Sequence, residues 1–215
     1  MLWKFRNSGI PIYTGIESLE ALGNPTFEKI RFKKGKNSTE LPAEILFLQQ
    51  GVVPNIQITR QLGCVHRWYS IQRYWEPLVD EWGNTSIAGV SIAGDCGRVS
   101  GAAISENSGH VAALDTVFKL GAISKEYRDL LSQSHRKLLS RHQAVRLFLD
   151  DLFQPGKAWL VPEDEDTLVC RCEEVSVREV RGAVRMGALS PDRVKPMIRC
   201  GMGPCQGRMC GLPVS

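Results

Sequence analysis

The feature that most constrains this chain is a concentration of cysteine in its last fifth. Five of the seven cysteines in the 215-residue sequence lie there: Cys170, Cys172, Cys200, Cys205 and Cys210. A Cys-x-Cys pair comes first, and a Cys-x4-Cys pair follows after a longer interval. Ordinary core packing does not require such an arrangement, whereas thiolates are the ligands of iron–sulfur clusters. The spacing therefore predicts a 2Fe-2S site.

Local geometry supports this prediction. In an extended segment, side chains at positions i and i+2 point to the same side, so Cys170 and Cys172 can present two sulfurs to one metal. Cys205 and Cys210 would lie on divergent faces of a regular helix, so at least one of them must occupy irregular backbone. The glycines around them supply that freedom and let backbone N–H groups approach sulfur.

The spacing alone leaves alternatives open. Cys200 and Cys205 are spaced as Cys205 and Cys210 are, so either couple can be the second pair of ligands. A structural zinc site uses the same ligands and tolerates this spacing. We expect no disulfide framework, because a chain of this length does not need one and its first residues lack a secretory signal.

The cysteine motifs also resemble those of a known domain. The runs VCRCEEV and VKPMIRCGMGPCQGRMCG are similar to the domain related to bacterioferritin-associated ferredoxin, in the form fused to the FAD-containing alpha subunits of hydrogen cyanide synthase, opine oxidase and proline dehydrogenase. In that family the ligands are the Cys-x-Cys pair and the two cysteines of the Gly-Met-Gly-Pro-Cys-Gln-Gly-Arg-x-Cys run. The resemblance implies Cys170, Cys172, Cys205 and Cys210 as the metal ligands, with Cys200 as a spare thiol beside the cluster.

Two earlier segments resemble flavoproteins of the disulfide reductase type, which have two dinucleotide-binding domains. The GVVPN run at residues 51–55 is similar to the segment that leaves the NAD domain and returns to the FAD domain. The run at residues 85–95 is similar to the strand that ends in Gly-Asp against FAD. The resemblance implies that Gly94 lets the cofactor approach the backbone and that Asp95 accepts a hydrogen bond from a ribitol hydroxyl.

The remaining patterns predict an α/β fold. Strand character predicts strands at residues 10–13, 27–32 and 43–48, and a buried parallel strand that ends at Gly94. Apolar periodicity predicts helices over residues 101–120 and 125–153, the second with an apolar stripe that repeats every seven residues. A capping box and a Ser-Pro pair predict two short helices, starting at Ser176 and Ser190, around the cysteine loops. Cys64 and Cys96 lie far from the cluster in sequence, and both are expected to be buried thiols.

We therefore expect the C-terminal portion of a flavoprotein with two dinucleotide-binding domains, then a helical segment, then a small, mainly helical 2Fe-2S domain. The predicted boundaries are 1–121 for the partial FAD/NAD(P)-binding domain, 122–161 for the helical arm and linker, and 162–215 for the ferredoxin-like domain. No Gly-x-Gly-x-x-Gly fingerprint for the FAD pyrophosphate occurs in the sequence. FAD binding is thus expected only with an N-terminal half, supplied by a longer protein or by another chain.

These features predict the electron-transfer subunit, or a fragment of it, of a FAD- and 2Fe-2S-dependent dehydrogenase that oxidises an amino acid, opine or related amine. The resemblance implies other dehydrogenase subunits as partners, including a flavin-containing subunit that oxidises the substrate, and no residue is predicted to be catalytic. Two alternatives are a structural zinc-binding interaction module and part of another flavoenzyme, such as a glycerol-3-phosphate dehydrogenase or a nitrite reductase.

Charge and hydropathy argue against a nucleic-acid partner and against a membrane-spanning segment. The net charge of +4 is modest and is not gathered into one basic tract, so nucleic acid is not expected as a partner. No apolar run approaches the length of a membrane span, so no transmembrane segment is expected. Clustered reduced cysteines without an export signal favour a cytoplasmic location.

Overall fold

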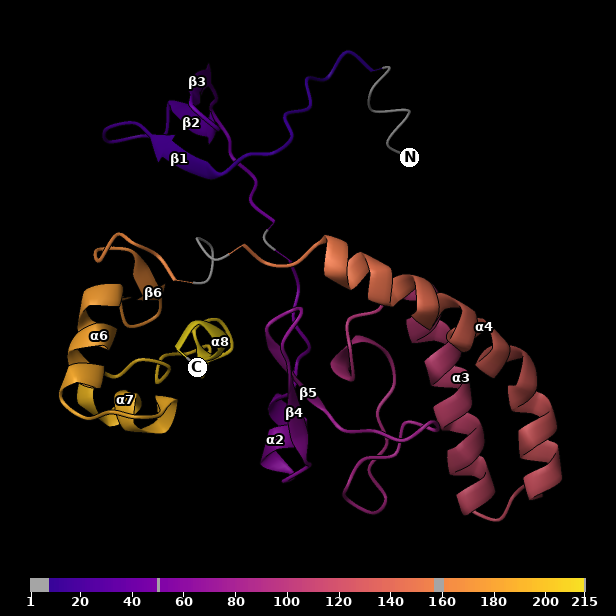
Figure 1. Ribbon diagram of the computed structural model, residues 1–215. Coiled ribbons are helices and arrows are strands. Elements are labelled where there is room, and N and C mark those ends of the chain that lie inside the picture. Colours follow the sequence, from indigo (N-terminus) through magenta and orange to yellow (C-terminus); the bar gives the residue numbers. More distant parts are fainter. Residues whose placement is uncertain (1–7, 50, 157–160, 215) are drawn as a thin grey trace. The chain divides into compact units, whose positions relative to one another are not determined.

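The computed structural model describes residues 8–49, 51–156 and 161–214. The chain divides into two compact units, Met1–Gln49 and Gln50–Ser215. The boundary between the units lies beside the GVVPN run at residues 51–55, where the resemblance places a crossing between domains. Figure 1 labels the helices and strands of both units.

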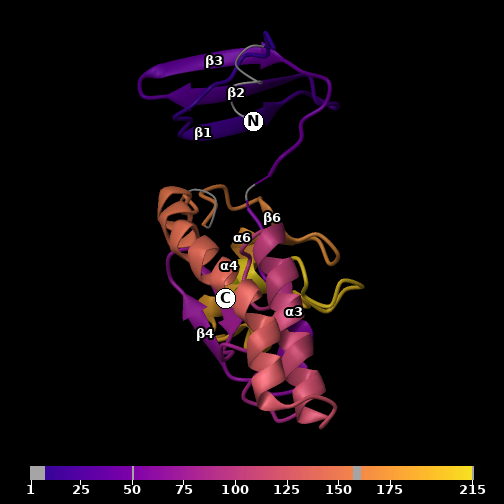
Figure 2. The ribbon, with the colours of Figure 1, turned by 90° about the vertical axis from the view of Figure 1, so that its right-hand side faces the viewer.

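The first unit is a three-stranded antiparallel sheet, visible face-on in Figure 2. Its strands, in spatial order, are β1 (Ser18–Leu22), β2 (Lys29–Lys34) and β3 (Asn37–Pro42). Gly35, with a φ of 58°, allows the tight turn after which Lys34 pairs with Asn37. Phe32 is buried, and its ring lies 4.8 Å from that of Tyr13, so this side of the sheet has a small apolar core.

The predicted strands of this unit are only partly correct. The strand predicted at 27–32 is present, shifted to Lys29–Lys34, but its partner is Asn37–Pro42 rather than 43–48, and residues 10–13 form no strand. The tight turn brings the residues directly after it into pairing, so the ladder is complete before the apolar run begins. Ile45, Phe47 and Leu48 are consequently exposed, although their alternation suggested a strand.

The second unit begins with a short helix, a hairpin and a helical pair. The elements are α2 (Gln57–Gln61), β4 (His66–Tyr69), β5 (Tyr74–Pro77), the 3-10 turn η1 (Gly94–Cys96), α3 (Ala102–Lys119) and α4 (Lys125–Leu152). Strands β4 and β5 pair antiparallel, and the predicted aromatic run lies on this hairpin, where Trp68 and Trp75 form an edge-on pair with centroids 5.6 Å apart.

The buried parallel strand predicted to end at Gly94 is absent from this part of the structure. Residues 85–93 make turns instead, with a single antiparallel bridge between Asn84 and Ser91. A parallel strand requires a neighbour that supplies its hydrogen-bonding partners, and no strand among the described residues lies beside this segment. The apolar composition of residues 85–93 therefore does not by itself produce a strand.

Helices α3 and α4 confirm the two long helices predicted from periodicity, and they lie side by side as an antiparallel pair in Figure 2. Gly121, with a φ of 76°, follows the end of α3, and Ser124 caps α4 by accepting a hydrogen bond from the N–H of Tyr127 at 3.2 Å. An ion pair joins the helices, with Arg128 Nη1 2.7 Å from Asp115 Oδ1. These caps and charges fix where the two helices begin and end.

The predicted apolar stripe of α4 is not the face that packs inside the described chain. Most stripe residues are exposed: Leu131, Leu138, Val145 and Leu152. The buried residues of α4 are polar instead, namely Arg128, Ser132 and Asp150. The apolar residues that recur every seven positions therefore lie on the solvent-facing side of α4 in the described chain.

The C-terminal part of the second unit is a small domain that matches the predicted plan. Its elements are β6 (Leu168–Cys170), β7 (Val175–Ser176), α6 (Val177–Arg185), α7 (Pro191–Ile198) and α8 (Gly211–Val214). Three of the cysteines, Cys170, Cys200 and Cys210, are buried in one cluster with Val175, Ala183, Ala188 and Val194. The core of this domain therefore consists largely of the residues that surround the thiols.

The predicted capping box at the start of α6 is present. The Ser176 hydroxyl accepts from the N–H of Glu179 at 3.4 Å, and the Glu179 carboxylate accepts from the N–H of Ser176 at 2.8 Å. We expect Ser176→Ala to lower the unfolding free energy of this domain by about 1 kcal/mol, because an orphan helix N–H loses its acceptor. Thermal unfolding followed by far-UV circular dichroism measures the change.

Ser190 is the matched control, since it caps α7 without any side-chain hydrogen bond. Ser190→Ala is expected to change the unfolding free energy by no more than about 0.5 kcal/mol. Equal losses for the two variants would show that the capping box at Ser176 does not stabilise the domain.

Among the residues that the structure describes, no helix is both long and apolar enough to cross a membrane.

Candidate metal centre

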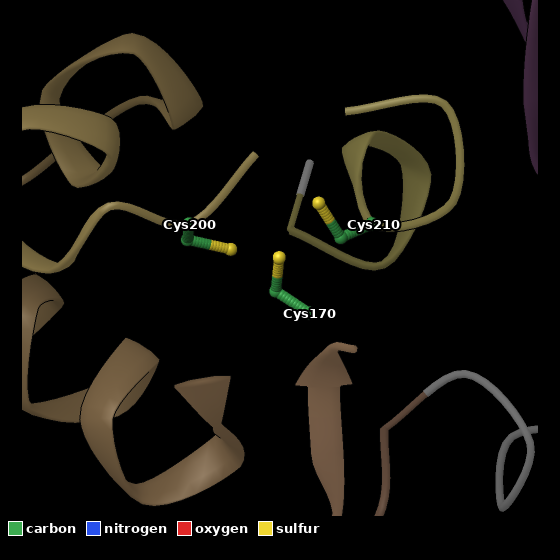
Figure 3. A group of neighbouring side chains, drawn as sticks. All are labelled: Cys170, Cys200 and Cys210. Atoms are coloured by element: carbon green, nitrogen blue, oxygen red, sulfur yellow. The ribbon is translucent and has the colours of Figure 1, made fainter. Parts of the chain in front are cut away.

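Three cysteine side chains converge in the C-terminal domain. Cys170 is the last residue of β6, Cys200 follows the end of α7, and Cys210 directly precedes α8. All three are buried, and their sulfur atoms lie within 4.8 Å of one another. Figure 3 shows that the three side chains come from separate segments and meet in one place. Only folding brings these thiols together, so the site belongs to the tertiary structure.

The other two cysteines form a second couple. Cys172 lies in the turn between β6 and β7, and Cys205 lies in the turns that precede α8. Their thiols lie close enough for each to influence the protonation of the other. Cys172 is exposed and Cys205 is half-buried, so this couple lies at the surface of the domain.

Of the four predicted ligands, Cys170 and Cys210 lie in the buried group with Cys200, whereas Cys172 and Cys205 lie outside that group. Cys170 and Cys172 are two residues apart in the Cys-x-Cys motif, so the buried trio and the Cys172–Cys205 couple are neighbours along the chain. The fifth thiol, Cys200, lies within the buried trio rather than apart from it. In the sequence, Cys200 and Cys205 have the same spacing as Cys205 and Cys210, and this spacing was the indication that Cys200 could lie near the site.

Backbone N–H groups are directed at two of the sulfurs. Burial alone would raise the pKa of Cys170, but the N–H groups of Gly201 and Glu173 donate to its sulfur and bring the pKa below the ordinary value. The N–H of Met209, together with the Cys172 thiol, likewise lowers the pKa of Cys205. These donors stabilise negative charge on sulfur, which is the form that binds metal.

The two remaining members of the trio behave differently. Burial raises the pKa of Cys210 to about 12, and the neighbouring Cys200 and Cys170 sulfurs add to the effect. Burial also raises the pKa of Cys200. Without a cation, charge in the trio therefore concentrates on Cys170. A metal cation reverses this tendency, because a coordinating thiol loses its proton in the metal's field.

Close packing holds the two halves of the site together. A Cβ added at Gly203 would lie 2.4 Å from the Cβ of Cys172, so the loop that carries Cys205 approaches the Cys-x-Cys turn with no room for a side chain. Gly201 has a φ of 83°, and an added Cβ there would lie 3.6 Å from the Cys210 sulfur. The donor set, the N–H groups and this close approach fit a 2Fe-2S cluster held by four thiolates.

Two arginine side chains near the thiols already have hydrogen-bonding partners. Arg199 Nε lies 2.7 Å from the Glu173 carboxylate, and Arg208 Nε donates to the Gln57 side chain at 2.7 Å. Arg199 also has a φ of 61°, so it reverses the chain at the end of α7 and directs Cys200 inward. Positive charge is thus present around the thiols, with one guanidinium offset by a carboxylate.

The predicted flavin contact lies in the loop before α3. Gly94 has a φ of 71° and its N–H donates to the Ser108 hydroxyl at 2.9 Å. The exposed Asp95 accepts at Oδ1 from the N–H of Ser100 at 3.2 Å and from the Ser105 hydroxyl at 3.0 Å. Asp95 therefore holds the loop against the first turn of α3.

The other predicted thiols have separate environments. Cys64 is buried, as expected, but Cys96 is exposed, so the prediction of a buried thiol at Cys96 is wrong. Cys96 is the last residue of the η1 turn, in the loop before α3. Among the described residues, neither cysteine belongs to a group of potential metal ligands.

Family models match both parts of the chain. A model described as pyridine nucleotide-disulphide oxidoreductase matches residues 1–113, which is more than half of the sequence. A model described as BFD-like 2Fe-2S binding domain matches residues 168–214, the segment that contains all five clustered cysteines. The expected α/β class, with a flavoprotein portion before a small iron–sulfur domain, is thereby confirmed.

Curated relatives and a solved structure agree with these matches. The A subunit of opine oxidase from Agrobacterium tumefaciens is 35% identical over 215 residues, which is 100% of this chain and 42% of the relative. The HcnB subunit of hydrogen cyanide synthase from Pseudomonas aeruginosa is 27% identical, over 98% of this chain and 47% of the relative. The crystal structure of L-proline dehydrogenase from P. horikoshii shares the fold with a TM-score of 0.64 and 19% identity, over 94% of this chain and 38% of that one.

The chain spans less than half the length of these relatives. The family resemblance expected from the cysteine and Gly-Asp motifs is nevertheless confirmed in both parts of the sequence. The chain belongs to the pyridine nucleotide-disulphide oxidoreductase family and carries, at residues 168–214, a BFD-like 2Fe-2S binding domain.

Proposed function

We propose that this chain is an electron-transfer subunit, or part of one, of a FAD- and 2Fe-2S-dependent dehydrogenase that oxidises an amino acid, an opine or a related amine. The observation that carries the proposal is the convergence of three buried thiols, Cys170, Cys200 and Cys210, in a domain attached to a flavoprotein portion. The similarity to an opine oxidase suggests the class of substrate. No residue of this chain is assigned a role in substrate chemistry.

In this proposal, Cys170, Cys172, Cys205 and Cys210 hold the cluster as thiolates. A bound 2Fe-2S cluster supplies a centre that accepts and releases one electron at a time. The chain's own contribution is to hold the four sulfurs, to direct N–H groups at Cys170 and Cys205, and to keep Cys170 and Cys210 out of water. These contacts favour the deprotonated ligands and exclude solvent from one side of the site.

For the flavin, we propose that Gly94 and Asp95 face FAD once the N-terminal part of the subunit is present. The positive φ of Gly94 gives a backbone that a cofactor can approach closely. The N-terminal end of α3 follows directly, and its exposed N–H groups favour negatively charged or electron-rich groups. We also propose that the flavoprotein portion spans residues 1–121, the helical arm and linker 122–161, and the 2Fe-2S domain 162–215.

The first experiment is anaerobic purification of the full chain followed by metal, sulfide and spectral analysis. We expect a brown protein with visible absorption and about two irons and two acid-labile sulfides per chain. The Cys172→Ala variant is expected to lose most of the iron, because its exposed sulfur has no replacement nearby. Retention of the full iron content by this variant would contradict the ligand set.

The same measurement distinguishes the principal alternative. A colourless protein with one zinc per chain and no sulfide would indicate a structural zinc module instead. Partner subunits are tested separately, by co-purification of the native complex and flavin analysis. Isolation of the chain without any flavin-containing partner would contradict the proposed assembly while leaving the cluster prediction intact.

A further inference from the structure

The buried trio contains one thiol more than the proposed cluster needs. Cys200 is 3% exposed, and its sulfur lies within 4.8 Å of the sulfurs of both Cys170 and Cys210. In Figure 3 the Cys170 side chain lies between those of Cys200 and Cys210. Cys200 is therefore a member of a potential coordination group, although the resemblance leaves it outside the ligand set.

The distances in the trio are close to those of metal coordination. Two thiolates on one tetrahedral metal lie about 3.8 Å apart when the metal–sulfur bonds are about 2.3 Å long. The limit of 4.8 Å for the three sulfur pairs is only about 1 Å greater. A rotamer adjustment of that size lies within the ordinary range of side-chain motion. Any two of these three sulfurs can therefore share one metal without a change of fold.

The second couple has no such spare thiol. Cys172 and Cys205 are free thiols, and neither belongs to a group of three mutually close metal ligands among the described residues. The site is thus asymmetric: one end has three thiols and the other end has two.

From this asymmetry we propose that Cys200 is a reserve ligand, which coordinates iron when Cys210 or Cys170 is removed. The inference rests on the proposed cluster. One iron–sulfur bond, to the lost ligand, is replaced by one to Cys200, whose thiol proton passes to solvent. The oxidation state of the iron does not change in this exchange, so no other reactant is needed.

The test compares four variants of the full chain, purified anaerobically: Cys200→Ala, Cys210→Ala, Cys205→Ala and the double variant Cys200→Ala/Cys210→Ala. Iron, acid-labile sulfide and the electron paramagnetic resonance spectrum of the reduced protein are measured for each. Cys200→Ala is expected to keep the wild-type metal content and spectrum. Cys210→Ala is expected to keep at least about half of the iron and sulfide, with a shifted spectrum, because a different thiolate coordinates the cluster.

The two other variants supply the contrast. Cys205→Ala and the double variant are both expected to fall below about one tenth of the wild-type iron and sulfide. The double variant keeps only three of the five clustered thiols, and Cys205→Ala leaves Cys172 as the one clustered thiol outside the buried trio. If Cys210→Ala contained as little iron and sulfide as Cys205→Ala, the reserve role would be overturned. A double variant that keeps as much cluster as Cys210→Ala would overturn it as well.

The same comparison is made at Cys170, with the single variant Cys170→Ala and the double variant Cys170→Ala/Cys200→Ala. Far-UV circular dichroism checks that each variant is folded. Loss of the cluster in Cys200→Ala alone would make Cys200 a resident ligand and contradict its reserve role. A wild-type chain without iron and sulfide would instead overturn the proposed function and this inference with it.

Discussion

The Gly203→Ala variant is expected to lose nearly all of its cluster, with at least about a tenfold decrease in acid-labile sulfide per chain. The added methyl group would lie 2.4 Å from the Cβ of Cys172 and 3.1 Å from the Glu173 carboxylate. A Cβ is fixed to the backbone and cannot rotate away, so the two cysteine loops must separate. Separation by even about 1 Å exceeds the tolerance of a metal site for its bond lengths.

A second glycine of the same domain provides the control. Gly182 lies inside α6, and an added Cβ there would meet nothing within 4 Å beyond its chain neighbours and the backbone of its own helix. Gly182→Ala is expected to keep the cluster and to stabilise the helix by up to about 1 kcal/mol, because alanine has the higher helix propensity. Sulfide and visible absorption are measured side by side for the two variants. Equal cluster contents would show that the close approach at Gly203 is not required.

The Asp150→Asn variant is expected to show the largest loss of stability, about 3 kcal/mol in unfolding free energy. Asp150 is fully buried near the end of α4, and its carboxylate accepts from Tyr69 at 3.0 Å and from Arg98 at 3.2 Å. Arg146 Nε also donates to it, at 2.6 Å, from one turn earlier on the same helix. The asparagine side chain lacks the negative charge, and its NH2 group would face side chains that are themselves hydrogen-bond donors.

The size of this loss reflects what the carboxylate holds together. It joins the end of α4 to the β4–β5 hairpin through Tyr69, and to the segment after η1 through Arg98. The Arg98 and Arg146 side chains keep about a quarter of their surface exposed, at 29% and 26%, so water partly compensates them. This exposure places the expected value at the lower end of the range for a broken buried pair.

Asp151 is the matched control for Asp150. It is the next residue of the same helix but is exposed, and it accepts only from the neighbouring Gln154 side chain in the described structure, at 2.8 Å. Asp151→Asn is expected to change stability by no more than about 0.5 kcal/mol. Guanidinium titration followed by the far-UV helical signal gives the two values. Coincident midpoints would mean that the buried carboxylate contributes nothing.

The elements that could be predicted from the sequence are those whose determinants are local. Gly121, with its positive φ, follows the end of α3, and Ser124 and Ser176 mark the starts of α4 and α6 through hydrogen bonds between residues close in sequence. The spacing of the five cysteines likewise predicted a metal centre in the correct domain. A capping residue or a ligand motif carries its physical meaning within a few positions.

The features that could not be predicted depend on distant partners. Residues 85–93 have the composition of a buried strand, yet no described strand pairs with them. The leucines of α4 have the periodicity of a packed face, but the buried contacts of the helix are made by Arg128 and Asp150. The resemblance implied Cys200 as a spare thiol beside the cluster, but its place in a buried trio with Cys170 and Cys210 needed three-dimensional information.

The amide donors around Cys170 and Cys205 have a consequence for how this domain can vary. Main-chain N–H groups of Gly201, Glu173 and Met209 face these two sulfurs. Every amino acid except proline carries that group, so replacing the side chain of Glu173 or Met209 leaves the polarity next to sulfur in place, whereas Gly201 is constrained by its φ of 83°. Mutational drift on the outer surface can therefore adapt the domain to new neighbours while the surroundings of the thiolates stay constant.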